Sequence, residues 1–418
     1  MDLSEVLGAE WKRALGCTEP ASIAYAAALA AQELAGDVIS AHLVCDPRIY
    51  KNCYAVGIPH SQGMVGILAA LALGASLRQA RSRLECFRDA DDAVLSQAGR
   101  LLAAGHVTVE VAKERRELLV DVRLSTVDNS ARAVIEAEHT NVVLLEKNGV
   151  SLPVDSTTGS QPADSAAIRK ELANSSFADL ILLAQSLSGE DATVLHKGVA
   201  LNLTIAHHGL SLFPRRVFQM MGSDAVTRLS RLVCAGVYAR MSGEDFTVMT
   251  LAGSGNKGIT TAVPLSLWGK DNGHDQRRID EALVLAILVT SATTHNLGTL
   301  SAVCGCSNAA GIGLAAGIVY LEGGGEKEIS LAMNNMVGNV TGMICDGAKI
   351  GCAMKTMTSV DAAFRSAALA LAGIGIPQSD GIIGKDGKES LYNLGRIARR
   401  GMVATDAEII AIMQEKLE

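Results

Sequence analysis

The sequence is organised around one stretch, Gly342-Met343-Ile344-Cys345-Asp346-Gly347-Ala348-Lys349-Ile350-Gly351-Cys352-Ala353-Met354-Lys355. This stretch carries two cysteines, Cys345 and Cys352, among glycines and other small residues. A third thiol lies upstream in Leu300-Ser301-Ala302-Val303-Cys304-Gly305-Cys306. Three thiolates from two segments can hold an iron–sulfur cluster and leave one iron open as a Lewis acid. We therefore predict that the fold is built to place a reactive iron–sulfur site.

The residue types alone leave other interpretations of these cysteines open. Three buried, unreactive thiols would show the same spacing. No C-x-x-C pair is present, so the spacing does not favour a structural zinc site. Cys306 competes with Cys304 for the upstream position. Because residues two apart on a helix point to opposite sides, we expect a single cluster to use only one of them.

The composition indicates a globular chain with more than one core. The chain has 418 residues, of which 49% are apolar and 19% charged, and chains of this length usually divide into domains. Aromatic residues are only 3% and glycines number 41, so we expect a core of small aliphatic residues with close backbone approaches. The net charge of −7 and the absence of a basic run argue against nucleic acid as a partner.

The sequence also carries signals about location. No segment reaches the roughly 18 uninterrupted apolar residues of a transmembrane helix, so we expect no membrane partner. The start, Met1-Asp2-Leu3-Ser4-Glu5, is acidic and lacks the basic end of a signal peptide. Nine cysteines, an odd number, argue against a disulfide framework. We therefore predict a cytoplasmic protein, with a homo-oligomer as the default assembly.

Residues 3–35 are predicted to be helical, with an interruption at Glu19-Pro20. Proline is well tolerated in a first helical turn, so a helix is expected to start near Thr18 or Glu19. Cys17 then lies at or just before a helix N-terminus. The helix dipole favours a thiolate there and would lower the pKa of Cys17. Alternatively, Cys17 is a buried helix-start cysteine without a reactive role.

The fold class predicted from the remaining patterns is α+β. A mixed α/β domain with a small antiparallel sheet is expected over 36–160, and residues 1–35 and 161–418 are expected to form a larger helical domain. A segment rich in Pro, Ser, Thr and Gly at 151–165 is predicted to be a loop or linker. Alternation and apolar periodicity predict strands over 37–59, 106–111, 118–124 and 133–145, and helices over 64–79, 90–104, 164–187, 192–208, 223–240, 277–294, 299–321, 326–340, 358–374 and 404–417.

Small residues in the predicted helix 299–321 indicate that it is central. Gly305, Ala309, Gly313 and Gly317 recur every four residues. Residues four apart share one helix face, so together they make a smooth stripe to which another backbone can come close. With the N-terminal helix packed on the helical domain, we expect Cys17 to meet the cluster at a domain interface, a usual place for a ligand site.

The stretch Gly253-Ser254-Gly255-Asn256-Lys257-Gly258 matches G-x-G-x-x-G, but we reject a dinucleotide site. No clear long helix is predicted after it, and the βαβ unit is missing. Glycine-rich backbone with a lysine can form an anion nest suited to a substrate carboxylate, and a plain turn is equally compatible. Similarly, Lys51 and Asn52 either bind a small anionic substrate or end a solvated strand.

Other catalytic signatures are weak. His139 and His295 are single histidines, which are usually structural, and His207-His208 is adjacent rather than i, i+4 and makes a poor metal pair. No Ser/His/Asp set, Walker loop or H-E-x-x-H motif is present. A pyridoxal-phosphate lysine stays open, because its local signature is loose.

Taken together, these stretches resemble one family over nearly the whole chain. The chain looks like the L-cysteine desulfidases, relatives of the alpha chain of iron–sulfur L-serine dehydratase. The resemblance is carried by Leu15-Gly16-Cys17-Thr18-Glu19-Pro20, Lys51-Asn52, Gly253-Ser254-Gly255-Asn256, Gly258-Ile259, His295-Asn296, Leu300-Ser301-Ala302-Val303-Cys304, Met343-Ile344-Cys345-Asp346-Gly347-Ala348 and Cys352-Ala353-Met354-Lys355.

The resemblance implies a [4Fe-4S] cluster held by Cys304, Cys345 and Cys352, with Cys304 preferred to Cys306. It implies that Cys17 is a base near the substrate, and that the reaction converts L-cysteine to pyruvate, ammonia and hydrogen sulfide. An open iron would stabilise the leaving sulfur, and a base must remove the Cα proton. The expected substrate-binding residues are Lys51, Asn52, Ser254, Gly255, Asn256 and His295.

Three alternatives remain beside the carbon–sulfur lyase. An iron–sulfur L-serine dehydratase would use the same site. Many bacterial members of that branch carry a cysteine near the C-terminus, whereas this chain ends Met413-Gln414-Glu415-Lys416-Leu417-Glu418, which favours the desulfidase branch. A non-catalytic iron–sulfur sensor would bind a cluster without turnover. A structural protein with buried thiols would bind no iron.

Overall fold

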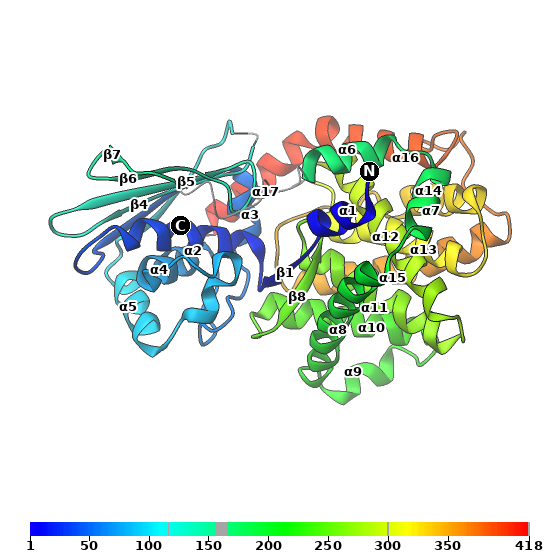
Figure 1. Cartoon of the computed structure of the whole chain (residues 1–418), viewed down its shortest axis with the longest axis horizontal. Coiled ribbons are helices and arrows are strands. Elements are labelled where there is room, and N and C mark those ends of the chain that lie inside the picture. Colours follow the sequence, from blue (N-terminus) through cyan, green and yellow to red (C-terminus); the bar gives the residue numbers. More distant parts are fainter. Residues whose placement is uncertain (116, 155–164, 299–300, 417–418) are drawn as a thin grey trace.

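A computed structural model describes residues 1–115, 117–154, 165–298 and 301–416. The predicted α+β class is confirmed. Figure 1 shows a sheet covered by helices at one end of the molecule and a larger body of helices at the other. The predicted linker at 151–165 lies largely outside the described residues, as do residues 299 and 300 of the upstream cysteine segment.

The larger sheet is mixed rather than purely antiparallel. It has six strands in the order β3-β2-β4-β5-β6-β7, with β2 and β3 parallel and the other neighbours antiparallel. The predicted strand 133–145 is in fact two strands joined by a turn in which Ala137 has a φ of 66°. The bounds are β2 Ser40–Cys45, β3 Val107–Val111, β4 Leu119–Ser125, β5 Ser130–Glu136, β6 Val142–Lys147 and β7 Val150–Ser151.

The prediction of strand over all of 37–59 was wrong in its second half, where the chain forms helix α3 (Pro47–Cys53). The Asp46 side chain accepts hydrogen bonds from the backbone N–H groups of Arg48 and Ile49, and Pro47 occupies the first helical position. Both features start helices. As a result Lys51 and Asn52 lie on a buried helical turn, not at a solvated strand end.

The N-terminal region also differs from the predicted helix. Helix α1 (Leu3–Glu10) is followed by strand β1 (Trp11–Leu15), and α2 (Thr18–Gln32) comes next. Strand β1 pairs antiparallel with β8 (Thr247–Leu251) in a separate two-stranded sheet. The side chains of Trp11, Ala14 and Leu15 are buried, so a distant partner strand overrides the local helical tendency.

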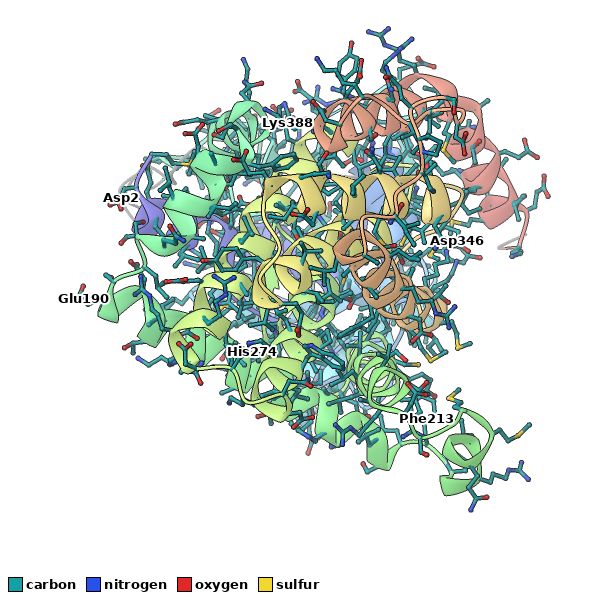
Figure 2. All side chains as sticks on the ribbon, turned by 90° about the vertical axis from the view of Figure 1, so that its right-hand side faces the viewer. Asp2, Glu190, Phe213, His274, Asp346 and Lys388 are labelled. Atoms are coloured by element: carbon teal, nitrogen blue, oxygen red, sulfur yellow. The ribbon has the colours of Figure 1, made fainter. Side chains whose placement is uncertain are left out.

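Helices make up the rest of the chain. Most predicted helices are confirmed in position. The helix predicted over 164–187 is two helices, α6 and α7, and the one predicted over 299–321 begins only at Gly305. Helix α15 begins earlier than predicted, and α9, α11 and α16 were not predicted. The segment around α9 projects from the body near Phe213 in Figure 2. The bounds are α4 Ile67–Leu77, α5 Asp92–Ala103, α6 Ser165–Asn174, α7 Phe177–Gln185, α8 Gly189–Ser211, α9 Arg215–Met220, α10 Ala225–Ser242, α11 Gly255–Asp271, α12 Gln276–Leu297, α13 Gly305–Leu321, α14 Glu326–Val340, α15 Gly351–Leu371, α16 Gly387–Arg396 and α17 Val403–Glu415, with a 3-10 turn at Arg83–Asp89 and a π-helical turn at Ile397–Gly401.

Helix α13 is central, as its small residues predicted. It packs against α12 so closely that a Cβ added to Gly313 would overlap the Thr290 hydroxyl. A Cβ added to Gly317 would lie 2.9 Å from the Ala282 carbonyl oxygen. Every described residue of α13 from Ser307 to its end is buried. This packing fixes the start of α13, where Cys304 lies.

Two clusters of buried apolar residues divide the described chain. One cluster fills the helical body, and the other lies between the large sheet and helices α2, α4 and α5. Helix α2 belongs to the sheet's cluster, so we propose that it be counted with the mixed domain rather than with the helical domain. The chain begins over the helical body, and α17 returns to the sheet's cluster through Ile410 and Met413 (Figure 1).

The cysteines and the apolar helices give two further observations on the fold. All nine cysteines are free, in agreement with the predicted absence of a disulfide framework. Among the described residues, no helix combines the length and apolar character needed to cross a membrane.

Candidate functional site

One cavity of about 80 Å³ gathers most of the residues singled out from the sequence. Its walls come from both parts of the molecule: α2 and α3 contribute from the sheet's side, and α11, α13 and α15 contribute from the helical body. Figure 2 shows the helical body end-on and labels Asp346, the residue after Cys345. The predicted residues that line the cavity are Cys17, Lys51, Asn52, Ser254, Asn256, Cys304, Cys345 and Cys352.

Two predicted substrate-binding residues do not line the cavity. Gly255 is not part of the cavity wall, and an added Cβ there would meet the Arg240 guanidinium and the Val248 side chain. His295 lies in the last turn of α12. Burial and the cations of Arg399, Lys170 and Arg169 lower the pKa of His295.

Four helices begin at this cavity. Cys17, Ser254 and Cys304 are the N-cap residues of α2, α11 and α13, and Cys352 lies in the first turn of α15. None of these four helices has a side-chain hydrogen bond capping its N-terminus, whereas Asp or Ser side chains cap α1, α3, α5, α7, α8, α10, α12 and α16. Uncapped N–H groups and the helix dipoles make the cavity favourable for negative charge.

The two cysteine segments are tied to each other by backbone hydrogen bonds. The Cys304 N–H donates to the Met343 carbonyl at 2.9 Å, and the Cys345 N–H donates to the Ala302 carbonyl at 2.7 Å. Gly347 has a φ of +95°, and a Cβ at this position would overlap the Lys51 carbonyl oxygen. Only glycine lets the loop approach α3 this closely.

The three thiols share an electrostatic environment. The neighbouring Cys306 thiol and burial raise the pKa of Cys304 well above its usual value. Burial and repulsion from Cys304 raise the pKa of Cys345, against the opposing effect of Lys51 and Lys355. Burial, again with repulsion from Cys304, raises the pKa of Cys352 to about 12. All three thiols line the same cavity.

These residues fit the implied [4Fe-4S] cluster in their chemistry. Three thiols of one wall are surrounded by the ammonium groups of Lys51, Lys257 and Lys355 and by uncapped helix N-termini, which suits a thiolate-bound cluster with net negative charge. Within the described ranges, no three His, Cys, Asp or Glu side chains are spaced to hold a single metal ion. A four-iron cluster binds each cysteine through a different iron, so its thiolates need not converge on one point.

Cys306 remains a competitor of Cys304 as a ligand. Its sulfur lies 3.4 Å from the Ser254 hydroxyl oxygen, it interacts with the Cys304 thiol, and it lines the same cavity. The prediction that the two side chains point to opposite sides of one helix does not apply, because Cys304 is the N-cap of α13 and has an extended backbone.

The pKa of Cys17 is raised, whereas its position at a helix N-terminus predicted a lowered one. Burial and the neighbouring Glu19 carboxylate raise the pKa of Cys17 far above its usual value. The Cys17 thiol donates a hydrogen bond to Glu19 Oε2 at 2.9 Å. Burial acts to raise the pKa of Glu19, but His139 and the hydrogen bonds from Cys17 and Thr18 hold it below the usual value. The favourable helix dipole is therefore outweighed, and the pair consists of a thiol and a carboxylate.

Lys51 and Asn52 make contacts inside the protein. Lys51 is 1% exposed, and its ammonium group donates to the Cys345 carbonyl at 2.8 Å and forms an ion pair with Asp406 of α17. The Asn52 amide donates to Glu19 Oε1 at 3.2 Å. Lys51 thus holds the loop of Cys345, and Asn52 holds Glu19.

Three further residues that line the cavity carry buried polar groups and were not among the predicted site residues. Arg240 is 2% exposed and donates to the Gly16 carbonyl and to the Asn256 side chain, each at 2.8 Å. Burial lowers the pKa of Lys257 to about 8, and its ammonium group donates to the Ala252 carbonyl and the Thr294 hydroxyl. The His139 Nε2 atom is buried and has no hydrogen-bond partner among the described residues. Only Lys257 lay inside a recognised motif; Arg240 and His139 arrive by packing.

Comparison with known proteins supplies the family. The model described as serine dehydratase alpha chain matches residues 110–411. A UPF0597 protein of Geobacter sulfurreducens is 38% identical over 424 residues, covering 99% of this chain and 98% of that protein. UPF0597 proteins of Caldanaerobacter subterraneus and Desulfotalea psychrophila are 32% and 35% identical, with the same coverage.

The match extends over more than half of the chain. It includes the two segments that carry Cys304, Cys345 and Cys352, together with α11 and α15. The family is related to iron–sulfur serine dehydratase, which indicates an enzyme of the lyase type. The relatives, whose similarity runs from end to end, carry no more specific description than UPF0597. The chain therefore belongs to the serine dehydratase alpha chain family.

Proposed function

We propose that the protein is a carbon–sulfur lyase that converts L-cysteine to pyruvate, ammonia and hydrogen sulfide. In this proposal Cys304, Cys345 and Cys352 hold a [4Fe-4S] cluster. The observation that carries it is the convergence of three distant cysteines and Cys17 on one cavity where four uncapped helices begin. Membership of a family related to iron–sulfur serine dehydratase supports the same reaction type.

When bound, the cluster supplies a Lewis-acidic iron for the leaving group of the substrate. The residues of the chain then have separate tasks. The Lys51 ammonium group fixes the Cys345 loop by donating a hydrogen bond to the carbonyl oxygen of Cys345. Gly347 lets that loop lie against α3. Cys304 and Cys352 are buried, and the exclusion of water around them strengthens each electrostatic contact.

The substrate carboxylate is assigned to the start of α11. Ser254, Asn256 and Lys257 line the cavity there, and Arg240 lies behind them through its hydrogen bond to Asn256. Neither Arg240 nor Lys257 forms an ion pair with a carboxylate among the described residues. A substrate carboxylate would neutralise these buried cations, and a buried charge is stabilised most by such a partner.

L-Serine is the second candidate substrate, because the family is described by serine dehydratase. An open iron can bind a hydroxyl group as well as a thiol. The two activities share the site and the fold, so only turnover separates them.

The test is anaerobic reconstitution with iron and sulfide, followed by pyruvate formation from L-cysteine and from L-serine in parallel. We expect pyruvate and equimolar sulfide from L-cysteine, with D-cysteine as the stereochemical control. Turnover of L-serine alone would mean that L-serine, and not L-cysteine, is the substrate. If the protein holds iron and turns over neither amino acid, the catalytic proposal is wrong and a sensor replaces it. If it holds no iron, the thiols are structural.

A further inference from the structure

The Cys17–Glu19 pair raises a question that the proposed function leaves open. A base must remove the Cα proton of the substrate, and Cys17 lines the cavity. Its sulfur, however, carries a proton that is already donated to a carboxylate. Removal of a carbon-bound proton by a neutral thiol requires that the thiol lose its own proton in the same step.

The geometry provides an acceptor for that proton. Glu19 Oε2 lies 2.9 Å from Cys17 Sγ, and both side chains are buried in the cavity wall. Three donors hold the carboxylate in place: the Cys17 thiol, the Thr18 hydroxyl at 2.9 Å and the Asn52 amide at 3.2 Å. These donors leave the carboxylate little freedom to turn away from Cys17.

We propose that Glu19 is the positioning residue and final proton acceptor behind Cys17. The inference rests on the proposed function and deepens it. The Cα–H bond breaks as a new S–H bond forms on Cys17, and the original S–H bond breaks as an O–H bond forms on Glu19 Oε2. The electron pair of the Cα–H bond forms the Cα=Cβ bond, and the pair of the Cβ–S bond leaves with the sulfur.

The surroundings of the pair bear on its protonation. His139 faces Glu19 from the loop after β5, and Arg240 of α10 faces Cys17. Cys53 of α3 is near both. Glu19 is the group that most opposes a Cys17 thiolate apart from burial itself. A glutamate that opposes thiolate formation is unexpected if Cys17 acts alone as a thiolate base, but it is required if the carboxylate takes the proton.

Two models predict opposite results for Glu19→Gln. In one, Cys17 acts alone as a thiolate base; in the other, here called the relay, Cys17 passes its proton to Glu19. Without the carboxylate, a Cys17 thiolate forms more readily, so alkylation of Cys17 in cluster-free protein should become faster at a given pH. A lone thiolate base would then work better. The relay predicts instead that pyruvate formation falls by about 100-fold or more, the size of a lost proton acceptor, while bound iron is unchanged. Glu5→Gln, an exposed glutamate of α1, is the matched control and should change neither quantity.

The experiment measures three quantities on wild type and each variant: iron per chain after reconstitution, kcat/KM for L-cysteine against pH, and Cys17 alkylation by peptide mass spectrometry. Slower turnover with faster alkylation supports the relay. Unchanged or faster turnover in Glu19→Gln overturns it. If the wild type itself forms no pyruvate, the proposed function fails, and this is a separate outcome.

Two further measurements keep the inference testable if Glu19→Gln does not fold. In Glu19→Ala, formate should restore turnover in proportion to its concentration, and it should not do so in Cys17→Ala. In the wild type, L-cysteine deuterated at Cα should slow the reaction, and the solvent isotope effect should persist with that substrate because both protons move together. A solvent effect that disappears with the deuterated substrate would contradict the relay.

Discussion

Cys17 on one side of the cavity and Cys304, Cys345 and Cys352 on the other are all thiols whose pKa values lie above the usual range. Their neighbours differ. Beside Cys17 stands a carboxylate, Glu19, which opposes loss of the proton. Beside Cys345 stand the ammonium groups of Lys51 and Lys355, which favour it.

Burial therefore raises the pKa of the thiols on both sides, and the neighbouring charges decide what each side can do. The cationic core of an iron–sulfur cluster could displace the protons of the three-cysteine side, because lysines and helix N-termini already favour thiolates there. On the Cys17 side, burial and Glu19 both favour the protonated thiol. The predictions below test whether the two sides are as different as their neighbours indicate.

The largest effect is expected from Cys345→Ala. Loss of a cluster ligand should lower both bound iron and pyruvate formation by at least about 100-fold, because even outer partners of metal ligands cost 10–100-fold. Cys234→Ala, a buried cysteine of α10 away from the cavity, should bind iron as the wild type does. Iron content per chain after reconstitution is the measurement. Full iron content in Cys345→Ala would mean that the three-cysteine side is not a ligand set.

Gly313→Ala tests whether α13 holds Cys304 through its packing on α12. The added methyl group would overlap Thr290, so we expect a loss of about 3 kcal/mol in the free energy of unfolding. Gly99→Ala in α5 is the control, since nothing lies within 4 Å of the added methyl, and it should stabilise the protein by about 0.5–1 kcal/mol. Urea denaturation measures both. Equal effects of the two substitutions would contradict the close approach of α12 and α13.

Asp406→Asn tests the ion pair that supports the Cys345 loop. It leaves the buried ammonium group of Lys51 without its carboxylate, and removal of one partner of a buried pair costs up to about 3 kcal/mol. Glu408→Gln, exposed on the same helix, should cost nothing measurable. Thermal unfolding of cluster-free protein compares them. A neutral Asp406→Asn would show that α17 does not support the loop.

The smallest effect concerns the Cys17 side and acid. The pKa of Glu19 is held below its usual value, so the carboxylate stabilises the fold above its unfolded pKa of about 4.3, and this contribution is lost as the pH falls through the folded pKa. In cluster-free protein, Glu19→Gln should lower the stability by about 2 kcal/mol at pH 7, the size of hydrogen bonds to a charged group. The difference should shrink below about pH 4. A difference that is constant with pH would mean that Glu19 is not ionised in the fold.

Local patterns predicted the helical body well because its helices are long and their small residues are regularly spaced. The stripe in α13 correctly indicated a central helix, since nothing but close packing requires glycine at Gly313 and Gly317. The pairing of β1 with β8 was missed, because each strand is short and depends on a partner more than 200 residues away. Helix α3 was missed although Asp46-Pro47 is a local start signal, which the surrounding Val and Ile pattern concealed.

The candidate site was predictable to a similar extent. Motifs named the cysteines, Lys51, Asn52, Ser254 and Asn256, and the cavity includes them all. Motifs could not reveal Arg240, whose position depends on the packing of α10 against α11. They also gave the wrong pKa direction for Cys17, because the helix dipole is visible in a sequence whereas burial is not.

The contact between Lys51 and Asp406 also constrains the order in which the protein folds. The ammonium group that supports the Cys345 loop lies near the beginning of the chain, and its carboxylate partner lies near the end. The ion pair can hold Lys51 in place only after α17 has formed and packed against α3, so we expect the Cys345 loop to become ordered late in folding.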